Sequence, residues 1–171
     1  MIRAIVCVSE NWAIGKNNGL IFNLKHDMKF FRKTTANSIV VMGENTLLSL
    51  PGSKPLKNRV NIVLCPEGHE YEDCICFHEL EPLLTYISIL AKDQDIFVIG
   101  GGMMYRSMLP YCDEVLVTKV KEYIPDAQVF FPNLDEDPNF EIVNTSDVLE
   151  EDGKLFNFVT YRRKSSEEVH K

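Results

Sequence analysis

Residues 14–35 read Ile-Gly-Lys-Asn-Asn-Gly-Leu-Ile-Phe-Asn-Leu-Lys-His-Asp-Met-Lys-Phe-Phe-Arg-Lys-Thr-Thr, a loop rich in glycine and asparagine that leads into a helix. Asn23 is expected to cap this helix, because its side-chain oxygen can accept a hydrogen bond from the first turn. The helical period places Asp27 on the same face as three apolar residues. These are Leu24, Met28 and Phe31. A carboxylate is costly to bury alone, so Asp27 either lies at a rim, pairs with a base or binds a ligand with two N–H donors.

The composition is that of a soluble globular protein. The chain has 171 residues, of which 45% are hydrophobic and 25% charged, and its net charge is −7. This charge argues against a nucleic-acid partner, because phosphate binding needs a basic face. No apolar run is as long as a membrane span, and the N-terminus lacks the layout of a signal peptide. We expect a cytoplasmic monomer with neither a nucleic-acid nor a membrane partner.

The cysteines and histidines match no familiar metal motif. Five cysteines without an export signal are expected to be reduced thiols. His69, Cys74, Cys76 and His78 lie close in sequence, but the last three alternate as in a strand and their spacing fits no common zinc site. The sequence therefore predicts no metal.

Apolar runs bounded by turn residues predict six strands followed by a hairpin. The strands are expected at residues 2–9, 38–42, 59–64, 73–77, 95–99 and 114–120. The hairpin would join residues 140–144 and 155–162 through a turn at Asp152-Gly153. Further helices are expected near Pro82–Ala91 and at Met104–Leu109.

Strands that alternate with helices predict an α/β fold. We expect a single-domain, mixed, mostly parallel open sheet with helices on both faces and a C-terminal antiparallel hairpin. The domain would cover residues 1–163, and residues 164–171 would form a polar, frayed tail. Ligands of such sheets bind beyond the carboxyl ends of the strands.

Two strand-to-helix junctions carry glycines of the kind found at anion sites. Residues 98–105 (Val-Ile-Gly-Gly-Gly-Met-Met-Tyr) would let the backbone approach a pyrophosphate. Residues 41–46 (Val-Met-Gly-Glu-Asn-Thr) end a strand at a glycine and offer donors from Asn45 and Thr46. Either junction alone could be a tight turn. Two junctions together with the Gly/Asn loop at 15–19 favour a dinucleotide.

The order and spacing of these motifs resemble dihydrofolate reductase of the bacterial type over nearly the whole chain. The pieces that carry the resemblance are Ile14-Gly15 with Asn18, Asn23-Leu24 to Thr35 with its acid, Met42-Gly43 with Thr46, Arg59-x-Asn61, Ile99-Gly100-Gly101-Gly102 with Tyr105, Thr118, and Phe131-Pro132. The resemblance implies that the protein reduces 7,8-dihydrofolate to 5,6,7,8-tetrahydrofolate with NADPH. It would then serve one-carbon metabolism and be an antifolate target.

The resemblance gives Asp27 the central catalytic role. Asp27 would accept two N–H groups of the pterin and promote protonation of its N5, since a partly desolvated carboxylate has a raised pKa. Thr118 would support that carboxylate, and Arg59 would pair with the α-carboxylate of the substrate's glutamate tail. The apolar walls of the substrate site would be Ile5, Val6, Met28, Phe31, Leu50, Leu56 and Ile99.

The resemblance also implies a mobile loop and a cofactor site. The loop 14–22 would close over the nicotinamide, with Leu20 and Phe22 beside the reacting rings. Gly101, Gly102 and Thr46 would hold the pyrophosphate. The other cofactor contacts would be Cys7, Ile14, Gly15, Asn18, Leu20, Gly43, Glu44, Asn45, Leu64, Cys65, Ile99, Met103, Met104 and Tyr105.

Three departures from the family pattern bear on function. Phe22 stands where the family usually has Trp, and Ala127-Gln128 replaces the usual Gly-Asp; both bear on loop closure. Glu44 and Met103 stand where basic residues commonly meet the 2′-phosphate, which predicts a weakened preference for NADPH over NADH. The candidates for another cation there are Lys54, Arg106 and His69.

Two other interpretations explain part of the sequence. The pyrimidine reductase of riboflavin synthesis has a similar fold and cofactor site, but it does not explain the acid of the first helix or Arg59. A non-catalytic nucleotide-binding module would keep the glycines but has no reason to bury Asp27.

Overall fold

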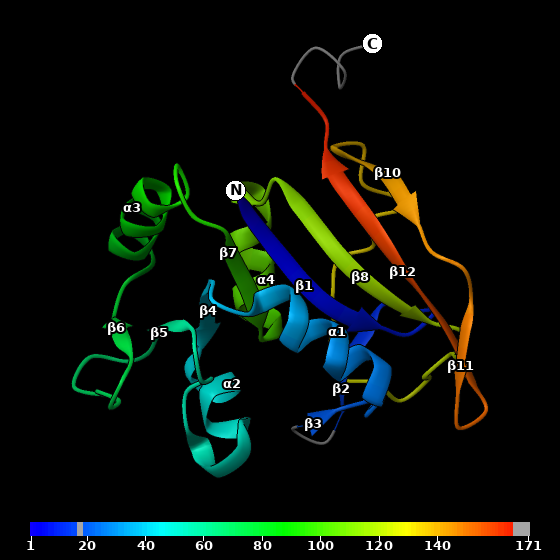
Figure 1. The fold of residues 1–171 in the computed structure, drawn as a ribbon, viewed down its shortest axis with the longest axis horizontal. Helices are drawn as coiled ribbons and strands as arrows, with labels where there is room; N and C mark the ends of the chain where they lie inside the picture. The colour runs from blue at the N-terminus through cyan, green and yellow to red at the C-terminus, as the bar shows by residue number, and fades with distance from the viewer. Residues whose placement is uncertain (17–18, 166–171) are drawn as a thin grey trace.

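The computed structural model describes residues 1–16 and 19–165, which form one large twisted sheet covered by helices (Figure 1). The strands of the sheet are β1 (Ile2–Val8), β4 (Ile39–Gly43), β5 (Val60–Leu64), β6 (Ile75–Phe77), β7 (Ile96–Gly100), β8 (Glu114–Val120), β10 (Phe140–Thr145), β11 (Leu149–Glu151) and β12 (Lys154–Arg163). Their order is β10-β12-β8-β1-β7-β4-β5-β6, with β11 also paired to β12. The strands from β8 to β6 pair in parallel, whereas β12 pairs antiparallel with β8, β10 and β11.

Helices cover both faces of the sheet. They are α1 (Lys25–Thr35), α2 (Glu44–Ser49), α3 (Leu80–Leu90) and α4 (Gly102–Met108), with 3-10 turns at Pro51–Ser53 and Leu109–Tyr111. Neighbouring residues of β1 point to opposite sides: Ile5 packs in a cluster with Phe31 and Leu47, while Val6 packs with Leu83 and Met104. Thus α1 and α2 lie on one face and α3 and α4 on the other, as the α/β prediction required.

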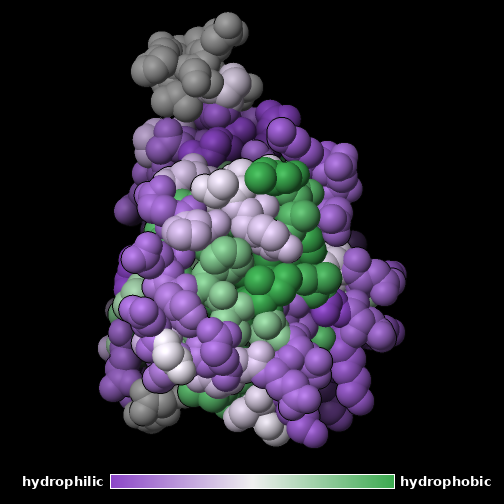
Figure 2. Space-filling model, turned by 90° about the vertical axis from the view of Figure 1, so that its left-hand side faces the viewer, coloured by the Kyte–Doolittle hydropathy of each residue, from purple (hydrophilic) through white to green (hydrophobic). Residues whose placement is uncertain are grey.

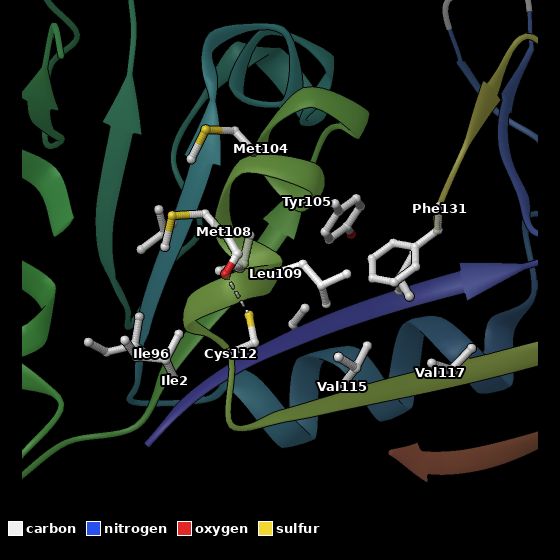
Figure 3. Packing of buried hydrophobic residues seen from close by; sticks show 14 of the residues in the cluster. Ile2, Ile96, Met104, Tyr105, Met108, Leu109, Cys112, Val115, Val117 and Phe131 are labelled. Atoms are coloured by element: carbon white, nitrogen blue, oxygen red, sulfur yellow. Dashed lines mark hydrogen bonds between the residues drawn. The ribbon is translucent and has the colours of Figure 1, made fainter. Parts of the chain in front are cut away.

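The core beneath α4 holds the start of that helix in place. Met104, Tyr105 and Met108 of α4 share one buried cluster with Val115 and Val117 of β8, and the Tyr105 ring points toward Phe131 (Figure 3). Burying an aliphatic or aromatic side chain of this size contributes roughly 1.5–3 kcal/mol. The glycines that precede α4 are therefore anchored by a helix with little freedom to shift.

The cap of α1 differs from the sequence prediction. The residue before the helix is Leu24, which makes no side-chain cap, and the Asn23 cap is wrong. Instead, the carboxylate of Glu151 in β11 accepts hydrogen bonds from the backbone N–H groups of Lys25 and His26, at 2.7 and 3.0 Å. These bonds lower the pKa of Glu151 to about 2. The negative charge of Glu151 also interacts favourably with the positive, N-terminal end of the helix dipole.

The C-terminal antiparallel strands are connected differently from the predicted hairpin. The Asp152-Gly153 turn joins β11 to β12, and both turn residues have positive φ, 52° and 80°. The predicted strand at 140–144 does pair with β12, but only after the chain has passed through β11. The antiparallel group is therefore present with one strand more than the sequence indicated.

A second, small sheet was not predicted. It consists of β2 (Ala13–Lys16), β3 (Gly19–Leu20) and β9 (Val129–Phe130), in the order β3-β2-β9. Strands of two to four residues are too short to leave a periodic pattern in sequence. This sheet places Gly15 opposite Val129, and the backbone N–H of Gln128 donates to the carbonyl of Gly15 at 3.0 Å. The loop that was expected to move is thus joined to the segment around residue 128.

The large sheet ends at the three-residue strand β6. Figure 2 shows this side of the molecule, where a hydrophobic area lies among hydrophilic residues. The more exposed apolar side chains of β6 and α3 are Ile75, Tyr86 and Ile89. A short edge strand offers few free backbone groups for pairing with another chain.

Within the described residues, none of the helices has the length and apolar character needed to cross a membrane.

Candidate active site

Asp27 lies in the first turn of α1 with its carboxylate facing the sheet. The hydroxyl of Thr118, in β8, donates a hydrogen bond to Asp27 Oδ1 at 2.6 Å. Thr118 is only 2% exposed, so this bond is sheltered from water. Burial raises the pKa of Asp27, and the hydrogen bonds from Thr118 and Cys7 oppose that rise. The carboxyl group can therefore exchange a proton closer to neutral pH than an exposed aspartate.

The thiol of Cys7 is a partner of Asp27 that the sequence did not reveal. Cys7 is the register partner of Thr118 across β1 and β8, so the two side chains lie side by side on the same face. Burial and the neighbouring Asp27 raise the pKa of Cys7 far above its usual range. The thiol is consequently protonated and is a donor toward the carboxylate. Cys7 was expected only as a cofactor contact.

Most of the expected apolar wall residues come together in one cluster. Five of the predicted residues share one cluster beneath α1 and α2: Ile5, Phe31, Leu50, Leu56 and Ile99. Met28 lies on α1 with 46% of its surface exposed. Val6 is not brought to the site, because it packs on the opposite face of the sheet. Phe30 and Leu116 join the cluster without having been predicted.

Arg59 is held at the far end of α1 by neutral groups. It donates to the hydroxyl of Thr35 at 2.9 Å and to the carbonyl oxygens of Lys57 and Arg32 at 2.7 and 3.2 Å. Burial and the nearby Arg32 lower its pKa, but a guanidinium stays charged at any physiological pH. A guanidinium has five N–H donors, and no acid is among the hydrogen-bond partners of Arg59 within the described residues. A positioned cation without an acidic partner suits a carboxylate ligand.

The two glycine junctions predicted from the sequence lie side by side. Met42 is in register with Gly100, and a Cβ added at Gly43 would lie 4.0 Å from the carbonyl oxygen of Gly100. A Cβ at Gly100 would meet the Thr46 hydroxyl at 3.1 Å, and one at Gly102 would lie only 2.5 Å from Val129. A side chain at Gly100 would fill the space beside Thr46, and one at Gly102 would collide with Val129 of β9. The bare backbone and the Thr46 hydroxyl therefore form a cradle that fits a pyrophosphate.

The remaining predicted cofactor residues differ in their position. Some lie at the ends of strands or in α2 around this cradle, and others have side chains buried in the core. Gly101 joins β7 to α4, Asn45 and Thr46 lie in α2, and Leu64 and Cys65 lie at the end of β5. Met103 is 75% exposed. The side chains of Ile14, Met104 and Tyr105 are buried in the core, and the Tyr105 hydroxyl donates to the carbonyl of Ile5 at 2.7 Å.

The structure gives only part of the expected loop. Gly15 and Leu20 pair across β2 and β3, and the Leu20 side chain is 88% exposed, so it is not packed against the substrate walls. Phe22 packs against the cluster of Leu24, Val120 and Phe156. Asn18 lies outside the described residues.

Glu44, which stands where the family commonly has a basic residue, is paired with a histidine and a tyrosine. Its Oε2 lies 2.5 Å from Nδ1 of His69 and accepts a hydrogen bond from the Tyr71 hydroxyl at 2.7 Å. These bonds lower the pKa of Glu44. Of the three cations proposed from the sequence, His69 is therefore the one that contacts Glu44. Tyr71 was not predicted.

Across residues 1–16 and 19–165, no group of three His, Cys, Asp or Glu side chains is arranged to hold a metal ion.

Comparisons with known proteins match the chain to one family. A family model described as dihydrofolate reductase matches residues 1–163. The dihydrofolate reductase of Bacillus subtilis (strain 168) is 31% identical over 170 residues, which cover 97% of this chain and 96% of that protein. The Ureaplasma parvum enzyme is 36% identical over 125 residues, covering 72% and 77% of the two chains. The solved structure of dihydrofolate reductase from Enterococcus faecalis complexed with NADP(H) and RAB-propyl superposes with a TM-score of 0.83 at 28% identity, covering 96% and 97% of the chains.

Proposed function

Because the chain belongs to the dihydrofolate reductase family and is an NADPH-dependent oxidoreductase that reduces 7,8-dihydrofolate, we propose that Asp27 is its catalytic acid. The observation that carries the proposal is a half-buried carboxylate with a raised pKa, held at 2.6 Å by the Thr118 hydroxyl. Asp27 accepts two N–H groups of the pterin and promotes proton delivery to N5. NADPH, when bound, supplies the hydride.

The other residues of the substrate site position the pterin and its tail. The cluster of Ile5, Phe31, Leu50, Leu56 and Ile99, together with Met28, holds the ring and excludes water from the reacting atoms. Arg59 binds the α-carboxylate of the glutamate tail, and Leu20 and Phe22 close the site from the loop. Thr118 and Cys7 act through Asp27, because both donate to its carboxylate.

The glycine cradle holds the cofactor. Gly43, Thr46, Gly101 and Gly102 bind the pyrophosphate through backbone N–H groups and one hydroxyl, and the other residues predicted from the sequence line the rest of the cofactor. The proposal is tested by following absorbance at 340 nm with NADPH and dihydrofolate together. A non-catalytic nucleotide-binding module would give no decay. A pyrimidine reductase would consume NADPH only with its own substrate.

The domain range, the oligomeric state and the location of the protein are proposals that come from the sequence. We infer a monomer made of one domain over residues 1–163, working in the cytoplasm without a nucleic-acid partner. The net charge of −7 supports the last of these. The weakened preference for NADPH over NADH also remains a prediction.

Removal of the Cys7 thiol is expected to shift the pH profile of kcat/KM toward higher pH. In Cys7→Ala, Asp27 loses a donor that favours its charged form, so its pKa rises. A neutral hydrogen bond contributes about 0.5–1 kcal/mol, which corresponds to roughly half a pH unit. The pH profile of kcat/KM for dihydrofolate measures the effect, and Cys7→Ser, which restores a donor, is the matched control. Equal profiles for alanine and wild type would show that the thiol has no influence on Asp27.

Reversal of the charge at residue 44 is expected to strengthen the preference for NADPH. Glu44→Arg replaces a carboxylate with a cation a few ångströms from the expected 2′-phosphate, a change of roughly 1–2 kcal/mol, or about tenfold. The ratio of kcat/KM for NADPH and NADH in wild type and variant measures it. A thousandfold preference in the wild type that Glu44→Arg leaves unchanged would mean that another cation reads the phosphate.

A further inference from the structure

The carboxylate of Glu151 holds the first turn of α1, the turn that carries Asp27. Its two oxygens accept hydrogen bonds from the backbone N–H groups of Lys25 and His26, at 2.7 and 3.0 Å. The ring nitrogen Nδ1 of His26 lies 2.7 Å from Oε1 of the same carboxylate. The side chain of Glu151 is only 11% exposed, so these contacts are sheltered from water. They fix the two residues that directly precede Asp27.

Asp27 is therefore held by two strands that lie far from α1 in the sequence. Glu151 of β11 holds the backbone before it, and the Thr118 hydroxyl of β8 holds its carboxylate at 2.6 Å. The backbone N–H that follows, that of Met28, donates to the carbonyl of Leu24 at 3.0 Å. A carboxylate that has to meet two N–H groups of a planar ring depends on such placement, because a displacement of about 1 Å can cost a hundredfold in rate.

Glu151 is also a charged neighbour of Asp27. The groups that interact electrostatically with Asp27 come from β1, α4 and β11, and they are Cys7, Tyr105 and Glu151. Burial raises the pKa of Cys7 and that of Tyr105 far above their usual range, so both are neutral. Hydrogen bonds from the first turn of α1 lower the pKa of Glu151 to about 2, so Glu151 is ionised. Burial is the main cause of the raised pKa of Asp27, and the negative charge of Glu151 adds to it.

We propose that Glu151 is a positioning residue of the reaction, which fixes the first turn of α1 and thereby sets how the Asp27 carboxylate meets the pterin. The proposal rests on the proposed role of Asp27 as the catalytic acid. Glu151 acts through Asp27, because its own carboxylate is occupied by the start of α1. Its charge helps Asp27 to keep a proton as pH rises.

The test compares pH profiles of kcat/KM for dihydrofolate between pH 5 and 9. Glu151→Gln keeps an oxygen acceptor for α1 but has no charge, so Asp27 should ionise at lower pH and the profile should shift in that direction. We expect a loss of roughly threefold at pH 8, the effect of one unit charge acting over several ångströms, and almost none at pH 5. A purely structural contact would lower kcat/KM equally at every pH.

Two further comparisons control for folding and for general charge. Glu151→Asp and Glu151→Asn have the same length and differ only in charge, so the asparagine profile should lie at lower pH than the aspartate profile. This pair repeats the test if Glu151→Gln does not fold. Glu150→Gln removes the same charge from the adjacent, exposed residue of β11, and its profile should coincide with that of the wild type.

A double variant tests whether Glu151 acts through Asp27. In the Asp27→Asn background, Glu151→Gln should cause no further pH-dependent loss, because the carboxylate on which its charge acts is absent. The inference is overturned if the Glu151→Gln profile coincides with that of the wild type, or if Glu151→Gln causes the same loss in both backgrounds. Near-normal turnover of Asp27→Asn alone would refute the proposed function, whereas a large loss there with an unshifted Glu151→Gln profile would refute only the role of Glu151.

Discussion

The Asp27→Asn variant should fold and lose on the order of a hundredfold or more in kcat/KM near pH 7. The amide cannot take part in proton delivery to N5, and it offers the pterin one oxygen in place of two. The loss should be measured from pH 5 to 9 and should be smallest in acid, where solvent can supply the proton. Near-normal turnover of this variant at pH 7 would contradict the assignment of Asp27.

The stability of the same variant provides its control. Burial raises the pKa of Asp27 in the folded protein, so the folded state binds its proton more tightly than the unfolded chain does. Ionisation of Asp27 therefore makes folding less favourable as pH rises above the unfolded pKa. Asp27→Asn removes this cost and should melt at the same temperature as the wild type or higher at pH 7. A large drop in melting temperature would mean that the lost activity reflects misfolding.

The sheet and the acid of the first helix could be predicted because both depend on local patterns. The run at 2–9 is apolar enough to identify β1, and the helical period places Asp27 among apolar residues. The cap of α1 could not be predicted, because Glu151 reaches Lys25 from a strand far along the chain. Asn23 has the right chemistry but lies one residue before the N-cap position, which Leu24 occupies, and Glu151 accepts the hydrogen bonds of those N–H groups instead.

Residue type alone also did not predict the face of the sheet to which a side chain points or the residues that it contacts. Ile5 and Val6 are both apolar and adjacent, yet the alternation of β1 sends only Ile5 toward the site. The pairing of β1 with β8 brings Cys7 beside Thr118, and no sequence spacing encodes that pairing. The sequence identified Glu44 as an unusual charge and His69 as one of three candidate cations. Only the fold shows that His69 and Tyr71, from the loop between β5 and β6, both contact Glu44.

Arg59→Leu should raise the KM for dihydrofolate about ten- to a hundredfold. The change in kcat should be smaller. A charge-assisted hydrogen bond contributes about 1.5–3 kcal/mol. The variant loses the bidentate pair with the α-carboxylate of the tail, whereas the contacts of the pterin end are unchanged. Arg59→Lys is the matched variant, because it keeps the charge and loses the planar fork, so its KM should lie between the two.

A substrate trimmed of its glutamate separates this role from a structural one. Arg59 also bonds to Thr35, Lys57 and Arg32, so its removal could loosen the end of α1. If Arg59 reads the tail, the trimmed substrate should have nearly the same kcat/KM in wild type and Arg59→Leu, because it has no carboxylate to lose. Equal losses for the full and the trimmed substrate would instead show that Arg59 holds the fold, since a displaced helix would harm the pterin contacts of both.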